Sequence, residues 1–138
     1  MNKELTRADE EIHITGKTIE EIFEKTAIAL TEIMVNTKTI EMKKKKKIIV
    51  TAQHEEELLL MFLEEIITLK DSEQLLFKSF KCKVSSIKSK ISNLTCTTTG
   101  DTINKKQELR TDIKGITRHE YSLKKTKKGW EATIIVDV

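Results

Sequence analysis

The sequence predicts an α+β fold in which two helices pack on a mostly antiparallel sheet, as a two-layer sandwich. Two segments repeat apolar residues with the period of an amphipathic helix, and most other apolar residues alternate with polar ones as in strands. The expected order is strand, helix, strand, helix and then several strands. Because the 138 residues contain no repeat and no linker, we expect a single domain over residues 1–138.

The first helix has a clear start signal. Residues 10–15 alternate in polarity and predict a short strand, which the turn at Gly16 ends. Thr18 and Glu21 form a capping box, so a helix is expected from Thr18 to about Val35. Its apolar stripe comprises Ile19, Ile22, Phe23, Ala27, Leu30 and Met34.

The second helix is expected after a strand over residues 43–51. Glutamates at 55–57 suit the positive end of a helix dipole, and this helix is expected to end near Asp71. The period then changes to that of strands. They are expected at residues 80–84, 93–99, 113–125 and 130–136, the last two forming a hairpin around Lys127-Lys128-Gly129.

Composition excludes several classes of protein. With 38% hydrophobic and 34% charged residues, the chain is typical of soluble globular proteins. No apolar run approaches the roughly 20 residues of a membrane span, and MNKELTRADEE lacks the apolar part of a signal peptide. We therefore expect a cytoplasmic protein without a membrane partner. Cys82 and Cys96 are expected as small core residues, and a disulfide between them stays open.

The charges are unevenly distributed, although the net charge is only +3. Glutamates concentrate in the predicted helices and lysines in the predicted strands, including the run Lys43 to Lys47. Such a basic sheet would attract RNA or an acidic partner, but lysines also solvate strands and block edge pairing. Tyr121 and Trp130 are the only tyrosine and tryptophan, which is little aromatic surface for stacking bases.

Acidic groups at the two ends of the chain are the main candidates for a metal site. Asp9 precedes the first predicted strand, and Asp137 ends the last one, next to the terminal carboxylate of Val138. If the first and last strands are neighbours, these oxygens form a site suited to Ca²⁺ or Mg²⁺. The alternative is that aspartates so near the termini are simply solvated.

The residues give no independent case for an enzyme. His119 has no second histidine or cysteine at ligand spacing, and a lone histidine is usually structural or exposed. The four glycines stand too far apart for a phosphate-binding loop, and no nucleophile motif surrounds a serine or cysteine. A metal-dependent hydrolase would also lack an evident general base.

Four blocks of the chain together resemble the archease family. They are GKTIEEIFEKTAIALTEIMV at 16–35, ELLLMFLEEIITLKDSEQLLFKSF at 57–80, ELRTDIKGITRHEYSL at 108–123 and GWEATIIVDV at 129–138. The pattern Lys-x-x-Thr-x-His-Glu and the strand ending in Asp-Val are the more specific parts. The resemblance covers nearly the full length and implies the archease sandwich.

The resemblance also implies a function. Archeases assist an RtcB-type tRNA-splicing RNA ligase, promoting guanylylation of its active-site histidine and multiple turnover, and they meet tRNA through the ligase. The chain is then an activator and not an enzyme. The family's metal ligands correspond to Asp9 and Asp137, with Val138 supplying terminal oxygens. Lys114 and His119 match the family's charged strand and are expected to contact the partner.

The N-terminal motif departs from the family pattern. Archeases usually open with His-Thr-Ala-Asp-x-Gly, whereas this chain has Thr6-Arg7-Ala8-Asp9-Glu10-Glu11. Glu11 therefore stands where the family has glycine. Its carboxylate is expected either to act as an extra metal ligand or to obstruct the approach of the partner. The competing interpretation of the whole chain is a basic-sheet RNA-binding or chaperone module without a ligase partner.

Overall fold

The computed structural model describes residues 9–87 and 91–138, apart from the side chains of residues 9, 86 and 87. It contains two α-helices, a 3₁₀ turn and six strands. In chain order these are β1 (Asp9–Gly16), α1 (Ile19–Met34), η1 (Thr37–Thr39), β2 (Lys44–Ala52), α2 (Glu55–Glu73), β3 (Leu75–Ile87), β4 (Ile91–Thr102), β5 (Gly115–Thr126) and β6 (Gly129–Asp137).

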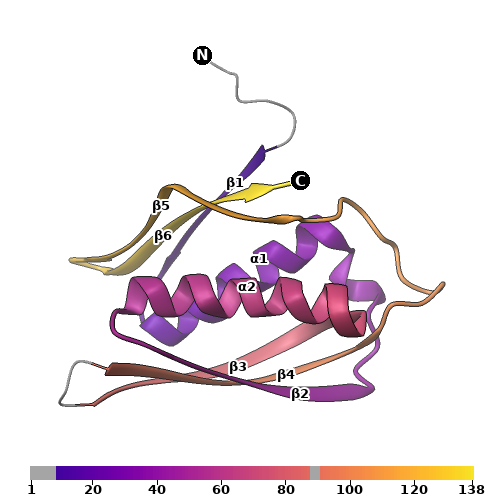
Figure 1. The fold of residues 1–138 in the computed structure, drawn as a ribbon, viewed down its shortest axis with the longest axis horizontal. Helices are drawn as coiled ribbons and strands as arrows, with labels where there is room; N and C mark the ends of the chain where they lie inside the picture. The colour runs from indigo at the N-terminus through magenta and orange to yellow at the C-terminus, as the bar shows by residue number, and fades with distance from the viewer. Residues whose placement is uncertain (1–8, 88–90) are drawn as a thin grey trace.

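The strands form two antiparallel sheets, ordered β1-β6-β5 and β2-β4-β3. Both helices contact both sheets, and Figure 1 shows them between the sheets. The α+β class with two helices and antiparallel strands is confirmed, whereas the single expected sheet is divided into two. The buried residues of α2 explain the division, because they occupy more than half of the helix circumference and need cover from two directions. They are Leu58, Leu59, Leu60, Phe62, Leu63, Ile66, Ile67, Leu69 and Lys70.

Helix α1 begins as the capping box predicts. The Thr18 hydroxyl accepts a hydrogen bond from the Glu21 N–H at 3.1 Å, and the Glu21 carboxylate accepts one from the Lys17 N–H at 2.7 Å. The bond from Lys17, together with the neighbouring Lys25 ammonium, lowers the pKa of Glu21. The last turn closes where the Val35 N–H donates to the Thr31 carbonyl at 2.9 Å.

Helix α2 runs slightly further than expected, to Glu73, and ends at Gln74 in the left-handed conformation with φ 55°. No helix among residues 9–87 and 91–138 is long and apolar enough to cross a membrane.

In the β2-β4-β3 sheet, Cys82 pairs with Cys96 in register, and both are buried free thiols. Their expected core role is confirmed.

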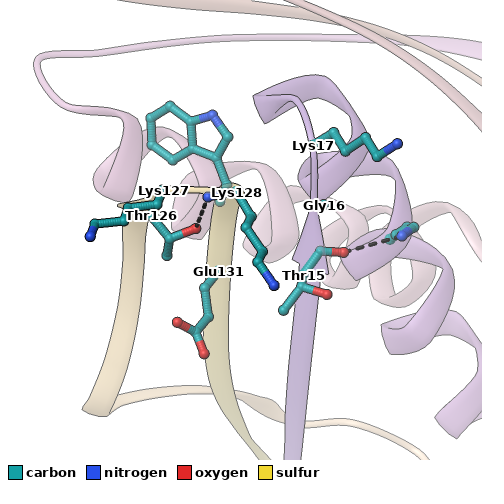
Figure 2. Close-up of a pocket in the computed structure, with 9 residues that line it drawn as sticks. Thr15, Gly16, Lys17, Thr126, Lys127, Lys128 and Glu131 are labelled. Atoms are coloured by element: carbon teal, nitrogen blue, oxygen red, sulfur yellow. Dashed lines mark hydrogen bonds between the residues drawn. The ribbon is translucent and has the colours of Figure 1, made fainter.

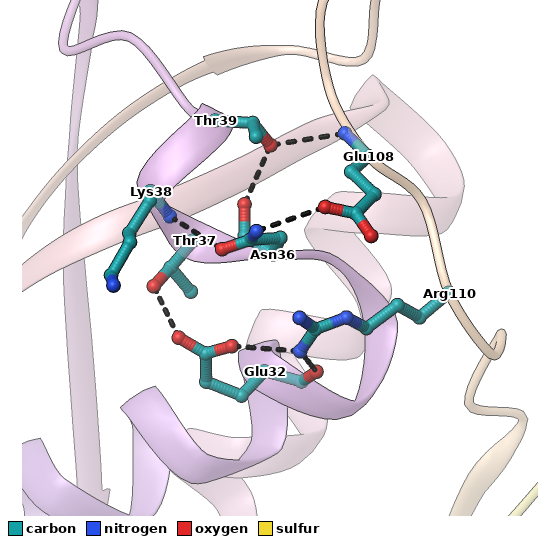
Figure 3. A network of polar contacts seen from close by, with 7 residues as sticks. All are labelled: Glu32, Asn36, Thr37, Lys38, Thr39, Glu108 and Arg110. Carbon is teal, nitrogen blue, oxygen red and sulfur yellow. Dashed lines mark hydrogen bonds and ion pairs between the residues drawn. The ribbon is translucent and has the colours of Figure 1, made fainter.

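A polar network holds the segment between β4 and β5 against the end of α1 (Figure 3). Asn36 donates from its backbone and its side-chain amide to the carbonyl and carboxylate of Glu108, each at 2.9 Å. Arg110 donates to the carbonyl and the carboxylate of Glu32, each at 3.0 Å. These contacts fix the path of the chain into β5 and so position Lys114 at the beginning of that strand.

Candidate functional site

The first and last strands are direct neighbours. In the antiparallel pairing of β1 with β6, Asp9 lies opposite Asp137. On the other side of β6, Gly115 lies opposite Asp137, and the Lys114 N–H donates to the Asp137 carbonyl at 2.8 Å. The backbone of Asp137 is therefore held from both sides, as expected of a residue at the end of a central strand.

Alternation along β6 determines which residues face solvent. Ile134 and Val136 are fully buried against the helices, whereas Asp137 is exposed. In β1, Ile12 is buried and pairs with Ile134, so Glu11, opposite Ile135, belongs to the outer face. Residues paired in register share a face of the sheet. The register thus assigns Glu11 and Asp137 to the outer face at one end of this sheet, where the backbone of Asp9 pairs with that of Asp137. We call this end of the sheet the acidic end.

The donor chemistry at this end suits a hard cation. Carboxylate oxygens are the ligands that Ca²⁺ and Mg²⁺ prefer, and Val138, half-buried against the core, follows Asp137 directly. Among the side chains that the structure describes, no three carboxylates, imidazoles or thiols gather closely enough to hold a metal ion. The Asp9 side chain lies outside that description, as do Thr6, Arg7 and Ala8 of the expected motif.

The two expected partner residues of β5 occupy different environments. Lys114 is exposed and immediately precedes the residue that pairs with Asp137. His119 lies in an irregular stretch, because the register of β5 against β6 shifts between Thr117 and Ser122. Its imidazole is 3.5 Å from the Glu120 carboxylate, and the His119 side chain is 80% exposed. The structure thus brings Lys114 to the acidic end, and it places His119 in the bulge.

The bulge is attached to the first turn of α2. Arg118 pairs with the Glu57 carboxylate at 3.3 Å, and this carboxylate raises the pKa of the guanidinium. The Tyr121 hydroxyl donates to the Glu56 carbonyl. Burial, and then the charges of Glu56 and Glu57, raise the pKa of Tyr121. Glu120 adopts a φ of 59°, so the backbone turns sharply where these contacts clamp it.

Sequence reasoning missed a pocket at the opposite end of the same sheet (Figure 2). It lies beside the β5–β6 turn, and its walls include Lys127, Lys128 and Trp130. The available signal was the group of four lysines at 124, 125, 127 and 128, which closely precedes the only tryptophan. A run of lysines at a hairpin is ordinary in isolation, and only the contact with the β1–α1 turn makes it a pocket.

Comparisons with known proteins agree with this architecture. The chain matches the model of the Archease protein family (MTH1598/TM1083) over residues 4–138. It is 33% identical over 127 residues to the protein archease of Thermococcus kodakarensis, covering 89% of this chain and 87% of that protein. It is 35% identical over 133 residues to the protein archease of Pyrococcus furiosus, covering 95% and 93%.

Two solved structures have the same fold. The solution structure of protein 1598 from Methanobacterium thermoautotrophicum matches with a TM-score of 0.84 and 29% identity, covering 96% of this chain and 94% of that one. The crystal structure of a Thermotoga maritima protein, described as an archease and possible chaperone, matches with a TM-score of 0.63 and 18% identity over 100% and 98%. The second likeness concerns the fold alone. The family match spans nearly the whole chain, which therefore belongs to the archease family.

Proposed function

We propose that this chain activates an RtcB-type tRNA-splicing RNA ligase, promoting guanylylation of the ligase and its multiple turnover. The observation that carries the proposal is the pairing of Asp9 with Asp137 at one end of the β1-β6-β5 sheet. Family membership supports an accessory role, and the acidic end would offer carboxylate oxygens to a partner. The chain itself performs no nucleotidyl transfer in this proposal.

In this proposal Asp9, Asp137 and an oxygen of Val138 hold a Ca²⁺ or Mg²⁺ ion. Without a cation, carboxylates gathered on one face would repel one another. A divalent ion bound there would supply charge neutralisation for a phosphate group. The residues of this chain would orient the ion, because Asp137 ends a strand that is paired on both sides.

The surroundings of the acidic end suit docking onto a larger protein. Lys114 and Glu11 flank Asp137 with opposite charges, and both are exposed. His119 is further along β5, on a bulge that Arg118 and Tyr121 tie to α2. We assign Lys114, Glu11 and His119 to contact with the ligase, since charged groups on a rigid edge set the orientation of docking and the rate of encounter.

The test is a reconstitution containing ligase, GTP, divalent metal and split RNA, with and without this chain. Asp137→Asn is nearly isosteric, so the fold should persist while stimulation of ligation beyond one turnover is lost. Glu131→Gln is the matched control, because Glu131 is an exposed carboxylate of the same strand at its other end. Full stimulation by Asp137→Asn at several metal concentrations would contradict the role assigned to this residue.

Metal binding is tested without the ligase, by calorimetric titration of the wild-type chain with CaCl₂ and with MgCl₂. We expect binding that Asp9→Asn and Asp137→Asn each weaken strongly and that Glu131→Gln preserves. If neither salt binds, or if the control weakens binding equally, then the cation does not belong to these aspartates.

A second candidate function, an RNA-binding module without a ligase partner, is favoured by the outer face of the other sheet. Lys47 and Lys81 lie in one row across β2, β4 and β3, with Thr97 between them. The next rows are Ile49, Thr95, Lys83 and Lys45, Thr99, Ser79. These three rows contain no carboxylate, and lysines with hydroxyls are typical contacts for phosphate backbones.

Salt dependence separates the two candidates. An RNA-binding module predicts direct binding of RNA that weakens steeply with rising salt and that Lys81→Gln with Lys83→Gln reduces. Ligase activation predicts weak direct binding of RNA and stimulation that this double variant preserves.

A further inference from the structure

An open pocket of about 630 Å³ lies where the β5–β6 turn meets the β1–α1 turn (Figure 2). Trp130, which forms part of its wall, is the register partner of Gly16 at the end of β1. The acidic end begins seven residues away at Asp9, and a strand of that length spans about 23 Å. The pocket is therefore separate from the site assigned to the metal and the ligase.

The walls of the pocket are fixed by close packing of two turns. Gly129 has a φ of +144°, and a Cβ atom at this position would lie 2.2 Å from the carbonyl oxygen of Gly16. The hairpin turn thus lies directly against the turn that leads into α1. The lysines of the two turns therefore line one cavity, although the side chains of Lys17 and Lys127 extend to opposite sides of it in Figure 2.

The lysines around the pocket outnumber its acidic groups. Lys17, Lys25, Lys127 and Lys128 line it, together with a single carboxylate, Glu131.

The ion pairs near the pocket neutralise only one of these four lysines. The Glu131 carboxylate is 3.0 Å from the His13 imidazole, and Lys25 pairs with Glu21 at 3.0 Å. Within the described part of the chain, Lys17, Lys127 and Lys128 take part in no ion pair. A cavity with several uncompensated cations attracts an anion.

The indole of Trp130 adds a flat apolar surface beside these cations. The ring is half-buried against the core, and the ammonium group of the Lys125 side chain lies over it, 5.8 Å from the ring centroid, where a stacked base would take its place. One aromatic ring cannot hold a row of bases, but it can stack a single base, which is worth about 1–3 kcal/mol in single-strand binding proteins. An inorganic anion alone would make no use of it.

We propose that this pocket binds one nucleobase that carries a phosphate, with the base against Trp130 and the phosphate near Lys127 and Lys128 of the adjoining turn. The ligand is either a free nucleotide or the terminal nucleotide of an RNA strand, which share this chemistry. The volume of about 630 Å³ lies within the range usual for small-ligand sites. The proposal does not depend on the ligase or on a bound metal.

Trp130 makes the test direct, because it is the only tryptophan of the chain. Its fluorescence is titrated with GMP, with AMP, with a short single-stranded RNA and, separately, with inorganic phosphate and guanosine. We expect saturable quenching by at least one nucleotide or by the RNA, with binding about tenfold weaker for phosphate or guanosine alone. Stronger binding of the mononucleotides identifies a nucleotide site, and stronger binding of the RNA identifies a strand-end site.

The matched variants carry equal charge changes. Lys127→Gln with Lys128→Gln should weaken binding about tenfold or more and reduce its salt dependence. Lys105→Gln with Lys106→Gln, at two exposed lysines of the segment between β4 and β5, should leave binding unchanged.

Trp130→Leu keeps an apolar wall, and its binding is followed by the polarisation of a labelled RNA and a labelled nucleotide. The proposal is overturned if no probe changes the fluorescence, if both lysine pairs weaken binding equally, or if Trp130→Leu binds like wild type. It is also overturned if polyglutamate quenches as strongly as the RNA, which would indicate an acidic protein as the partner. None of these outcomes involves ligase stimulation, so failure here is distinguishable from failure of the proposed function.

Discussion

Replacing Gly129 by alanine tests how tightly the β5–β6 turn is packed against the β1–α1 turn. Alanine at this position must adopt a φ near +144°, and its Cβ would lie 2.2 Å from the Gly16 carbonyl oxygen and 2.8 Å from the Lys17 Cα. Both contacts are with backbone atoms, so no change of rotamer relieves them. The turn must move, or the alanine must remain strained.

The expected cost follows from two contributions. Strained backbone conformations cost about 1–3 kcal/mol, and forcing an extra methyl into a packed region costs about 1–3 kcal/mol. We therefore expect Gly129→Ala to lower the free energy of unfolding by about 2–6 kcal/mol. At about 3–5 °C per kcal/mol for a domain of this size, the melting temperature should fall by about 6–30 °C.

Two other glycines provide graded controls in urea and thermal unfolding followed by circular dichroism. A Cβ at Gly115 meets nothing within 4 Å, so Gly115→Ala should leave stability within about 1 kcal/mol of wild type. A Cβ at Gly16 meets the flexible Glu21 side chain at 3.3 Å. The loss of stability in Gly16→Ala should therefore lie between the losses in Gly115→Ala and Gly129→Ala. If Gly129→Ala unfolds at the same urea concentration as Gly115→Ala, the close contact between the turns is wrong.

Three further predictions concern groups that hold the elements together. Lys70, which is 7% exposed, contacts the Asp112 carboxylate and the Ile113 carbonyl. In urea unfolding, Lys70→Met should lower the free energy of unfolding by about 1–3 kcal/mol, because the exposed carboxylate is rehydrated whereas the buried carbonyl loses its donor. Tyr121→Phe removes a hydrogen bond to the first turn of α2 and should cost about 1 kcal/mol, measured in the same way. The pKa of Glu21 is lowered in the folded chain. The difference in free energy of unfolding between wild type and Glu21→Gln should therefore be largest above the ordinary glutamate pKa and should vanish as the pH falls through the lowered pKa. An unchanged difference at acid pH would contradict the role of Glu21 in the cap.

Local signals in the sequence identified most elements of the fold. The capping box at Thr18 gave the start of α1, and the change of period after α2 gave the strands that follow. The expectation that the first and last strands meet was confirmed by the pairing of Asp9 with Asp137. Such signals succeed because caps and alternation depend on neighbours in the chain.

Features that depend on tertiary packing could not be predicted from those signals. The division into two sheets follows from the wide burial of α2, whose stripe was interpreted as one face. The bulge between Thr117 and Ser122 depends on contacts with the first turn of α2. The pocket beside Trp130 forms only because two distant turns meet at Gly129. The metal ligands and the partner contacts of Lys114, His119 and Glu11 stay predictions.

Because the helices lie between the two sheets, the outer faces of the sheets point away from each other (Figure 1). Energetic coupling between Lys81 and Trp130 would have to pass through α1 or α2, which contact both sheets. Substitutions far apart with no shared partners usually combine additively. Changes on the two outer faces should therefore combine without synergy, which would let evolution adjust one surface to a new partner while leaving the other intact.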